Sequence, residues 1–536
     1  MSALPPTVLR ETFGAKLRRL AAEAAPNNRA DALPLMPPPA WGTGQTIIKG
    51  NVRSNAGSWY QAVSNGTTGA TAPTGGVASS VVISDGAVSW VWLSYASVAS
   101  NDPLAPSSVT ITANAASTVV AALTNTGWQG SSFLPNLFRA YGDVWDLSSG
   151  WIGNLRGYQG TPYSAIAVGQ TYALNAYGVA NYNLYKLTTL TLSAPYSGAL
   201  PSGTSTFTDA NGNVWTYQSA AFKPSTTKVG FWVADYAFAI VTGNGQSLNP
   251  NRISIDGRYL SPDGVIATAS ATTNVVFQFA TRKPRLVTWE WPQNQQNTPT
   301  FVGVTTTPSG DVWLPAARDD VRAMFISDSI FDASSTYGPF IGGNQVAARV
   351  GARMGWTDIW QWCLGGTGWC ATNSGASRTY GQRIPDALAK NPDIWIFMGS
   401  TNDEAYSAAT VTAAVLAGLQ AVRAGGSTAP IVVFGLWSLS GALATEQAVQ
   451  AGVSAFTDPL GKTFFIPIYQ DPAFSWITGS WNYSGGAWNG NASNTLANNS
   501  AAYVSADNIH PSDSGSDYLA NRMVRALNTN VLPLLT

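Results

Sequence analysis

The stretch Phe325-Ile326-Ser327-Asp328-Ser329-Ile330 decides how the last part of this chain folds. An apolar run ends there on an Asp-Ser pair, a pattern that is typical of a buried strand turning into a helix. A serine at such a turn can present its hydroxyl to the crevice above a parallel sheet. The alternative is an ordinary helix N-cap, a position that serine favours. The stretch alone therefore predicts the fold but does not establish a nucleophile.

Downstream of Val321, apolar runs alternate with alanine-rich helical stretches. Strands are predicted at 322–327, 357–363, 393–398, 430–436 and 463–468. Helices are predicted at 343–355, 378–391, 410–425, 444–456 and 513–528. Such alternation predicts a five-stranded parallel sheet covered on both faces, with the ligand site at the carboxyl ends of its strands.

Two more polar clusters follow predicted strands of this sheet. Cys363-Leu364-Gly365-Gly366-Thr367-Gly368 is glycine-rich, so its backbone can approach a substrate and leave an N–H unobstructed. Ile396-Phe397-Met398-Gly399-Ser400-Thr401-Asn402-Asp403 brings a side-chain amide that can donate to a developing oxyanion. Taken singly, the first is also an ordinary loop and the second an ordinary helix cap.

The last cluster, Asp507-Asn508-Ile509-His510-Pro511, precedes the final predicted helix and holds the only histidine of the chain. An aspartate on a turn before the histidine can accept from Nδ1–H, fix the tautomer and stabilise the imidazolium that forms when Nε2 takes a proton. A lone histidine is usually structural. The four clusters together favour a base for a serine nucleophile.

In this order the four clusters resemble the SGNH (GDSL-like) hydrolase family over roughly residues 320–536. The resemblance implies a flavodoxin-like α/β fold and two-step acyl transfer without a cofactor or metal. By position, Ser329 would be the nucleophile, His510 the general base and then acid, and Asp507 the residue that orients His510. The implied oxyanion hole consists of the backbone N–H groups of Ser329 and Gly368 and the amide of Asn402.

The chain departs from the family pattern in three places. Cys363 stands where the family usually has Asn, and Gly368 is chosen as the oxyanion donor because it lies five residues beyond. Ser327 stands where the family usually has the Gly before Asp-Ser, and Ser400 where it usually has the Gly before the Asn. Both serines are expected to add a side chain near the oxyanion hole without removing a catalytic group.

Between Trp41 and about Ala317, short alternating runs separated by Gly, Asn, Asp and Pro predict all-β modules, including a β-sandwich. A faint repeat pairs the turn-and-tryptophan segments 85–90 and 211–215. The predicted division is an N-terminal helix and tether (1–40), a small β module (41–98), a β-rich connector (99–165), a second small β module (166–222), a β-sandwich (223–318) and the hydrolase domain (319–536).

The first small module, on the stretch 66–74, resembles small modules that are common in phage tail proteins and that are related to carbohydrate-binding modules. Its aromatic residues can stack on sugar rings or form the module's core, and both readings stay open; they are Trp59, Tyr60, Trp90 and Trp92. The amphipathic segment 7–24 predicts a helix that either anchors or oligomerises the protein, or is an ordinary terminal helix.

Composition limits the function classes. Lys+Arg and Asp+Glu both total 28, and charged residues make up 10% of the chain, which argues against nucleic acid as a partner. No apolar run is long enough to insert into a membrane. With two cysteines and one histidine, the sequence predicts no metal site. Cys363 and Cys370 are expected to form a disulfide or to remain as two free thiols. A neutral polar surface with many aromatics suits contact with glycans.

The start of the chain lacks an apolar signal core. With the β modules, this leads us to expect a virion protein resembling phage tailspike or tail-fibre deacetylases, which remove O-acetyl groups from host surface polysaccharide. A homotrimer that binds other tail proteins through its N-terminal segment is expected. The alternatives are a secreted or cellular carbohydrate or lipid esterase, and a non-enzymatic glycan-binding adhesin or structural fibre protein.

Overall fold

The computed structural model describes most of the chain, and every structural statement below concerns the described residues. These are residues 12–24, 34–75, 81–96, 106–113, 124–125, 139–141, 157–158, 161–162, 164–166, 168–174, 177–180, 183–201, 206–220, 226–242, 252–261, 273–292, 301–307, 309–315, 321–332, 345–356, 358–372, 378–438, 442–471, 476–477 and 503–535.

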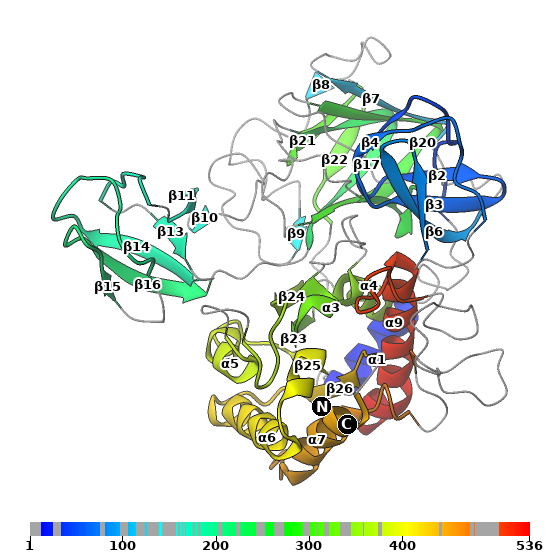
Figure 1. The fold of residues 1–536 in the computed structure, drawn as a ribbon. Coiled ribbons are helices and arrows are strands. Elements are labelled where there is room, and N and C mark those ends of the chain that lie inside the picture. The colour runs from blue at the N-terminus through cyan, green and yellow to red at the C-terminus, as the bar shows by residue number, and fades with distance from the viewer. Residues whose placement is uncertain are drawn as a thin grey trace, which may run out of the picture.

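The C-terminal part is a parallel sheet between two layers of helices (Figure 1). Its strands are β23 (Arg322–Ser327), β24 (Asp358–Cys363), β25 (Ile394–Gly399), β26 (Ile431–Leu436) and β27 (Thr463–Ile466). They run in the order β24-β23-β25-β26-β27, all parallel. This is the flavodoxin-like order. The predicted fold class, all-β modules followed by an α/β domain with a five-stranded parallel sheet, is confirmed.

Two hydrophobic cores lie on the two faces of this sheet. Phe325 on β23 faces the core formed with α4 (Val346–Met354) and α9 (Asp513–Ala526). Its neighbour Met324 faces the core formed with α5 (Tyr380–Leu388), α6 (Ala408–Ala424) and α7 (Ala442–Ala455). Because both faces are covered, β25 and β26 are buried at every residue, as their unbroken apolar runs indicate.

Local sequence sets where these helices begin and end. Thr379 and Gln382 form a reciprocal capping box at the start of α5. Ser407 caps α6, and its hydroxyl accepts from the N–H of Thr410. Gly355, at φ 68°, ends α4 in the left-handed conformation that glycine adopts without strain. Short helical turns complete the domain: α3 (Ser329–Asp332), η4 (Thr401–Ala405), η5 (Leu527–Val531) and η6 (Leu532–Leu534).

Helix α1 (Phe13–Ala24) lies on this α/β domain, although the β modules separate the two in sequence (Figure 1). Leu17 and Leu20 are buried in the core shared with α4 and α9. Arg18 donates to the carbonyl of Leu532 at 2.7 Å. The structure therefore agrees with the ordinary terminal helix, because the apolar face that would dock on another protein is covered by the α/β domain of this chain. The predicted tether between helix and module lies mostly outside the described residues.

The two small β modules share one strand order. In the first it is β2-β3-β6-β5, and in the second β13-β14-β16-β15, with β12 added at the edge. The first module contains β1 (Thr46–Ile47), β2 (Val52–Asn55), β3 (Ser58–Ala62), β4 (Gly66–Thr67), β5 (Val82–Asp85) and β6 (Val88–Tyr95). The second contains β12 (Ser164–Ala165), β13 (Tyr177–Ala180), β14 (Asn183–Thr189), β15 (Phe207–Thr208) and β16 (Val214–Ala220), preceded by the pair β10 (Gly157–Tyr158) and β11 (Thr161–Pro162). The repeat seen in the sequence is therefore a repeat of structure.

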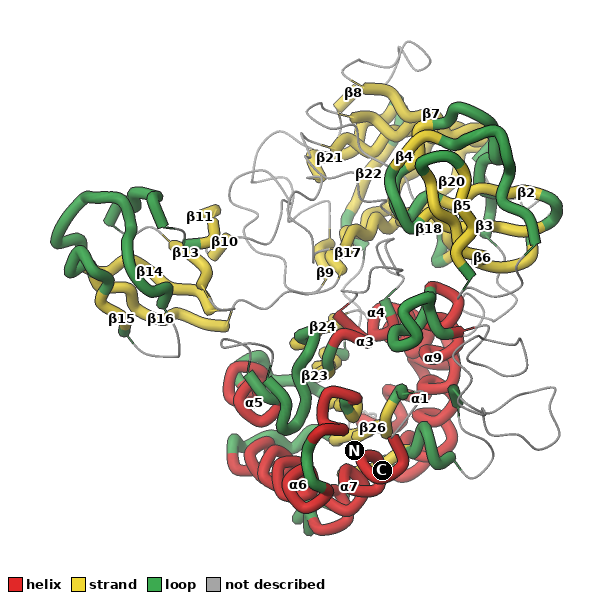
Figure 2. Tube along the Cα trace, viewed as in Figure 1, coloured by secondary structure: helices red, strands yellow, loops and turns green. Residues whose placement is uncertain are grey.

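The remaining β region is a nine-stranded sheet organised around two long strands, β17 (Thr226–Thr242) and β20 (Thr273–Pro292) (Figure 2). A register shift between Asp235 and Ala237 bends β17, so that Phe231 before it and Phe238 after it enter the same core. The other strands are β7 (Ser108–Ala113), β8 (Thr124–Asn125), β9 (Arg139–Tyr141), β18 (Arg252–Ile255), β19 (Arg258–Tyr259), β21 (Phe301–Thr306) and β22 (Asp311–Trp313). Strands β7, β8 and β9 come from the predicted connector, which thus contributes to this sheet.

Candidate active site

Ser329 is the first residue of α3, directly after β23 at the carboxyl edge of the sheet. The carboxylate of Asp328 accepts the N–H of Ile330 at 2.9 Å, and its carbonyl accepts from Phe331 and Asp332 at 3.2 Å. These bonds fix the turn that carries Ser329. Among the described residues no acceptor engages the N–H of Ser329, so this donor can turn to a substrate oxygen.

The turn before α9 joins Asp507 to His510. Asp507 Oδ2 lies 2.9 Å from His510 Nδ1, and Oδ1 accepts the N–H groups of Ile509 and His510, each at 2.9 Å. Ser505 Oγ donates to the same Oδ1 at 2.7 Å. Asn508 has φ 60°, a left-handed conformation that Asn tolerates and that closes the turn tightly. The carboxylate therefore orients the imidazole ring as the sequence predicts.

Burial and charge both act on this pair. Burial lowers the pKa of His510, but the hydrogen bond and charge of Asp507, with the carboxylates of Asp328 and Asp332, raise it above its ordinary value overall. Burial raises the pKa of Asp507, yet the hydrogen bonds from His510 and Ser505 and from two backbone N–H groups bring it well below its usual range. Asp507 is therefore ionised, and it stabilises the imidazolium form of His510.

Ser329, the predicted nucleophile, and His510, the predicted base, lie in one neighbourhood. The charges of Asp328 and Asp332, which flank Ser329 in sequence, act on His510. No hydrogen bond joins Ser329 Oγ to His510 Nε2 in the described part of the chain, and Nε2 is buried without a partner. Catalytic hydrogen bonds often close only when substrate binds. Of the two ring nitrogens of His510, Nδ1 is engaged by Asp507, so Nε2 is the one that remains available to take a proton.

Asn402 lies on η4, beyond the end of β25, and its amide is held in place. Asn402 Nδ2 is 3.0 Å from the carbonyl oxygen of Thr367, 3.0 Å from Ser400 Oγ and 3.4 Å from Asp328 Oδ2. The amide therefore stands beside the Asp328–Ser329 turn, where the sequence places the oxyanion donor. One of the two amide hydrogens is donated to the Thr367 carbonyl oxygen. The second is shared between Ser400 Oγ and Asp328 Oδ2.

Gly368 differs from its predicted role. Its N–H, expected to be an oxyanion donor, donates to the carbonyl of Ala371 at 3.0 Å. The physical reason is Asp403, whose carboxylate accepts the N–H groups of Trp369, Cys370 and Ala371 and folds this loop around itself. A Cβ at Gly368 would lie 2.3 Å from Asp403 Oδ1, so glycine is needed here for close packing. Among the described residues, the Ser329 N–H is the candidate donor that has no acceptor, and the Asn402 amide is the candidate whose hydrogens already have protein acceptors.

Ser327 and Ser400, which stand where the sequence resemblance leads one to expect glycine, make different contacts. Ser327 is buried, and its hydroxyl has no hydrogen-bond partner among the described residues. Ser400 is buried too, but its hydroxyl lies 2.6 Å from Asp328 Oδ2 and 2.8 Å from the carbonyl oxygen of Thr367. It also accepts the N–H of Asn402 at 3.1 Å. Of the two serines, only Ser400 makes side-chain contact with Asn402, the predicted oxyanion donor.

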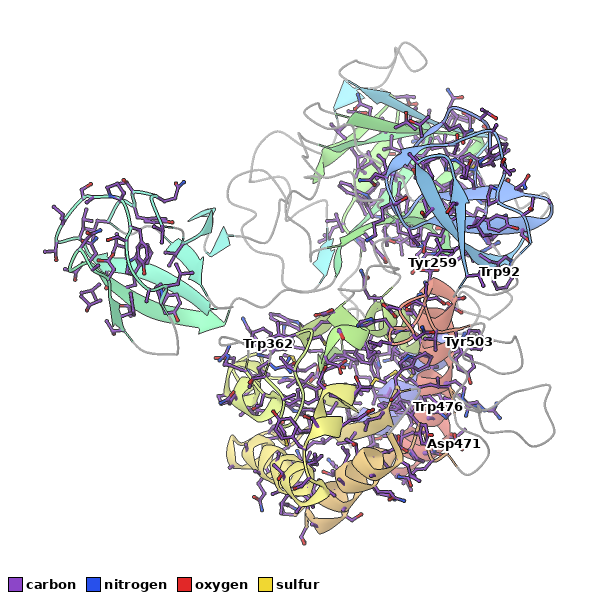
Figure 3. All side chains as sticks on the ribbon, in the orientation of Figure 1. Trp92, Tyr259, Trp362, Asp471, Trp476 and Tyr503 are labelled. Atoms are coloured by element: carbon purple, nitrogen blue, oxygen red, sulfur yellow. The ribbon has the colours of Figure 1, made fainter. Side chains whose placement is uncertain are left out.

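Sequence reasoning missed Arg383, a fully buried residue of α5. Its guanidinium donates to the carbonyls of Ser327 and Trp362 and, at 3.0 Å, to Thr367 Oγ1. Burial lowers its pKa to about 10, and no carboxylate among the described residues hydrogen-bonds to it. Trp362, labelled in Figure 3, marks this position on β24. A lone arginine on an otherwise apolar helix face was the available signal.

The four aromatic residues proposed for sugar stacking are not exposed platforms. Trp59, Tyr60 and Trp90 are 6%, 2% and 0% exposed and belong to the core of the first module. Trp92 is partly buried against that core, with its indole nitrogen buried, and it lies on β6, which contacts α9 (Figure 3). The core reading is therefore correct for this set.

Cys363 and Cys370 are free thiols, so the pair is not a disulfide in this structure. Burial raises the pKa of both thiols. No cluster of three or more His, Cys, Asp or Glu that could hold a metal ion occurs within the described ranges. Within the same ranges, no helix combines the length and apolarity that a membrane span requires.

The carboxyl edge of this flavodoxin-like sheet therefore carries a serine, a histidine oriented by an ionised aspartate, and an amide, which are the group types of a serine-hydrolase site. No protein-family model matches the chain, and no curated protein matches it. Solved structures with a similar fold include a family two carbohydrate esterase from Clostridium thermocellum in complex with cellohexaose. It is 18% identical with a TM-score of 0.41, over 57% of this chain and 93% of that one.

Two further similar structures catalyse different reactions. An acetyl xylan esterase from Butyrivibrio proteoclasticus is 12% identical with a TM-score of 0.38, over 68% of this chain and 98% of that one. A salicylyl-acyltransferase from a tetracycline biosynthetic pathway is 11% identical with a TM-score of 0.39, over 58% and 85%. Such distant likeness does not assign an activity, and we base the function on the geometry of the site.

Proposed function

We propose that the chain is a serine esterase that removes O-acetyl groups from a polysaccharide. The observation that carries this proposal is the buried, unpartnered Nε2 of His510, on a ring whose other nitrogen is held by an ionised Asp507 beside the Ser329 turn. A base needs such a nitrogen, and a structural histidine would pair it.

The reaction proceeds in two steps. Ser329 Oγ attacks the ester carbonyl while Nε2 of His510 takes its proton, and the Ser329 N–H and Asn402 stabilise the oxyanion. The imidazolium, held by Asp507, then gives the proton to the leaving sugar oxygen, which releases the alcohol and leaves an acyl group on Ser329. Water then attacks the acyl carbonyl while His510 takes its proton. The bond from the acyl carbon to Ser329 Oγ breaks, the acid leaves, and the imidazolium returns the proton to Oγ, so Ser329 and His510 are both regenerated.

The carbohydrate part of the proposal is supported by the neutral chain, in which charged residues make up 10% and aromatics 11%. Sugar hydroxyls need hydrogen-bond partners and sugar C–H faces need aromatic surface, rather than net charge. As a finer proposal, the protein acts in a phage tail, as a homotrimer, on O-acetylated polysaccharide of the host surface. A secreted esterase is the alternative setting.

Hydrolysis of p-nitrophenyl acetate by wild type and by Ser329→Ala tests the esterase. We expect wild-type turnover, a preference for acetate over butyrate, and loss of turnover in the variant. Ser327→Ala serves as the matched control, because it removes a nearby buried hydroxyl that has no partner. Equal activity in wild type and Ser329→Ala would remove Ser329 as the nucleophile.

Three further measurements test the finer proposals. Acetate release from O-acetylated bacterial polysaccharide, compared with acetylated xylan, tests the substrate class. Release from neither polymer, by a protein active on the small ester, would contradict the carbohydrate proposal. Light scattering tests the trimer, and a monomer would contradict it. Antibody labelling of purified phage particles tests the tail location, and unlabelled particles would contradict it.

A further inference from the structure

Ser400 occupies a junction between three segments of the active site. Its hydroxyl lies within hydrogen-bonding distance of Asp328 on the nucleophile turn, of Thr367 on the loop after β24, and of Asn402 on its own segment. The side chain is fully buried. The family that the sequence motifs resemble usually has glycine here. Because glycine has no hydroxyl, it cannot make these three side-chain contacts.

A count of hydrogens shows what Ser400 does. The hydroxyl has one hydrogen and two acceptors nearby, Asp328 Oδ2 at 2.6 Å and the Thr367 carbonyl oxygen at 2.8 Å. Its lone pairs face two donors of Asn402, the backbone N–H at 3.1 Å and Nδ2 at 3.0 Å. The hydrogen-bonding capacity of the hydroxyl is therefore fully used. The backbone N–H and the side-chain amide of Asn402 both donate to this one oxygen.

Thr367, the other partner of the Asn402 amide, is fixed from the opposite side. Its hydroxyl donates to the carbonyl of Leu364 at 2.6 Å and accepts from Arg383 at 3.0 Å. Arg383 also holds the carbonyl of Ser327, at the end of the strand that leads to the nucleophile. The Asn402 amide is thus held between Ser400 and a loop that a buried guanidinium anchors to that strand.

We propose that Ser400 is a positioning residue that sets the Asn402 amide in register with Ser329, through a hydroxyl that replaces the glycine of the related family. The inference rests on the proposed esterase function. Without the hydroxyl, Asn402 Nδ2 keeps Thr367 but loses Ser400, and Asp328 loses the donor that fixes its Oδ2. The amide then keeps only the Thr367 carbonyl oxygen and, at 3.4 Å, Asp328 Oδ2, so its orientation is less tightly fixed, whereas substrate binding itself is unchanged.

The test compares Ser400→Ala and Ser400→Gly with wild type on p-nitrophenyl acetate. We expect kcat to fall about 10- to 100-fold with KM unchanged, because misplacing a catalytic donor affects the transition state rather than binding. The control is Ser327→Ala, which removes an equally buried serine hydroxyl without a partner and should keep kcat. A kcat of Ser400→Ala within about twofold of wild type would overturn the proposal.

A double-mutant cycle separates positioning from general damage. In an Asn402→Ala background there is no amide to position, so Ser400→Ala should change kcat by less than about twofold. An equally large loss in that background would show that Ser400 acts elsewhere. If wild type is inactive on esters and is not labelled by a fluorophosphonate, the proposed function fails instead. Crystal structures then decide the positioning claim, which fails if the Asn402 amide stays in place in Ser400→Ala.

Discussion

Asp209 in the second β module and Asp507 in the α/β domain form similar local structures with different outcomes. Asp209 accepts the N–H groups of Asn211 and Asn213 and, at 3.1 Å, the indole Nε1–H of Trp215. Asp507 likewise accepts backbone N–H groups of its own turn and a ring nitrogen, Nδ1 of His510. Both carboxylates close a turn and fix a ring.

The difference lies in the ring. An indole has a single polar atom, so the interactions end at Trp215, which is fully buried in the module's core. An imidazole has a second nitrogen, and in His510 that nitrogen is buried without a partner. The same motif therefore stabilises the fold in one region and carries the proposed proton-transfer site in the other, and the buried ring nitrogen without a partner distinguishes the two.

The largest effect is expected for Asp507→Asn. An amide in place of the carboxylate no longer favours a hydrogen on Nδ1 and no longer stabilises the imidazolium, so kcat should fall about 10³- to 10⁴-fold. Hydrolysis of p-nitrophenyl acetate measures this, and circular dichroism checks that the variant is folded. A loss below about tenfold would mean that Asp507 closes its turn as Asp209 does and serves no base.

A stability effect without a kinetic one is expected for Asp209→Ala. The change leaves the Trp215 indole N–H and two backbone N–H groups without their acceptor, which costs about 1–3 kcal/mol of unfolding free energy. Calorimetry of the full chain measures the loss, and kcat should be unchanged.

Asp85→Ala provides the matched variant in the first module, where Asp85 accepts the indole N–H groups of Trp41 and Trp90. A fall in kcat for either variant under native conditions would contradict the purely structural role that the comparison assigns.

The smallest effect is a shift of the pH profile. His510 must be neutral to accept the proton of Ser329, so activity is lost as pH falls through its pKa. Because that pKa is raised, the acid limb should lie above the ordinary value of about 6.5. Burial raises the pKa of Asp328 to about 6, so two groups titrate in this region.

Asp332→Asn sharpens this test. It removes one carboxylate that raises the pKa of His510, so the midpoint of the acid limb should move to lower pH. The profile of kcat/KM between about pH 5 and 9 measures the shift in both proteins. A profile that is flat from about pH 5 to 8 in wild type would contradict a histidine base.

The α/β sheet could be predicted because its signals are local. Strands buried on both faces are read as apolar runs, and the described helices agree with the predicted ones to within a few residues. Ser329, Asp507, His510 and Asn402 were found for the same reason, since each stands directly after a strand or before a helix. The β modules had weaker signals, because alternation alone cannot tell which face of a strand meets the core.

What the sequence could not predict depends on distant contacts. Trp90 and Trp92 share one face of β6, and only the pairing with β3 decides how deeply each is buried. The engagement of Gly368 depends on Asp403, and the roles of Ser400 and Arg383 depend on loops that the sheet topology brings together. None of these has a periodic pattern, since hydrogen bonds between loops leave no signature along the chain.

Helix α1 has a consequence for how the chain is made. Its apolar residues, such as Leu17, belong to the core of the α/β domain, and the helix contacts α4 and η6, both of which follow the β modules in sequence. A ribosome therefore delivers this helix long before its partners exist, whereas each β module can fold as it emerges. The α/β domain is then completed last, by a contact between the first and last described elements. Until then the apolar face of α1 has no partner in the α/β domain to cover it.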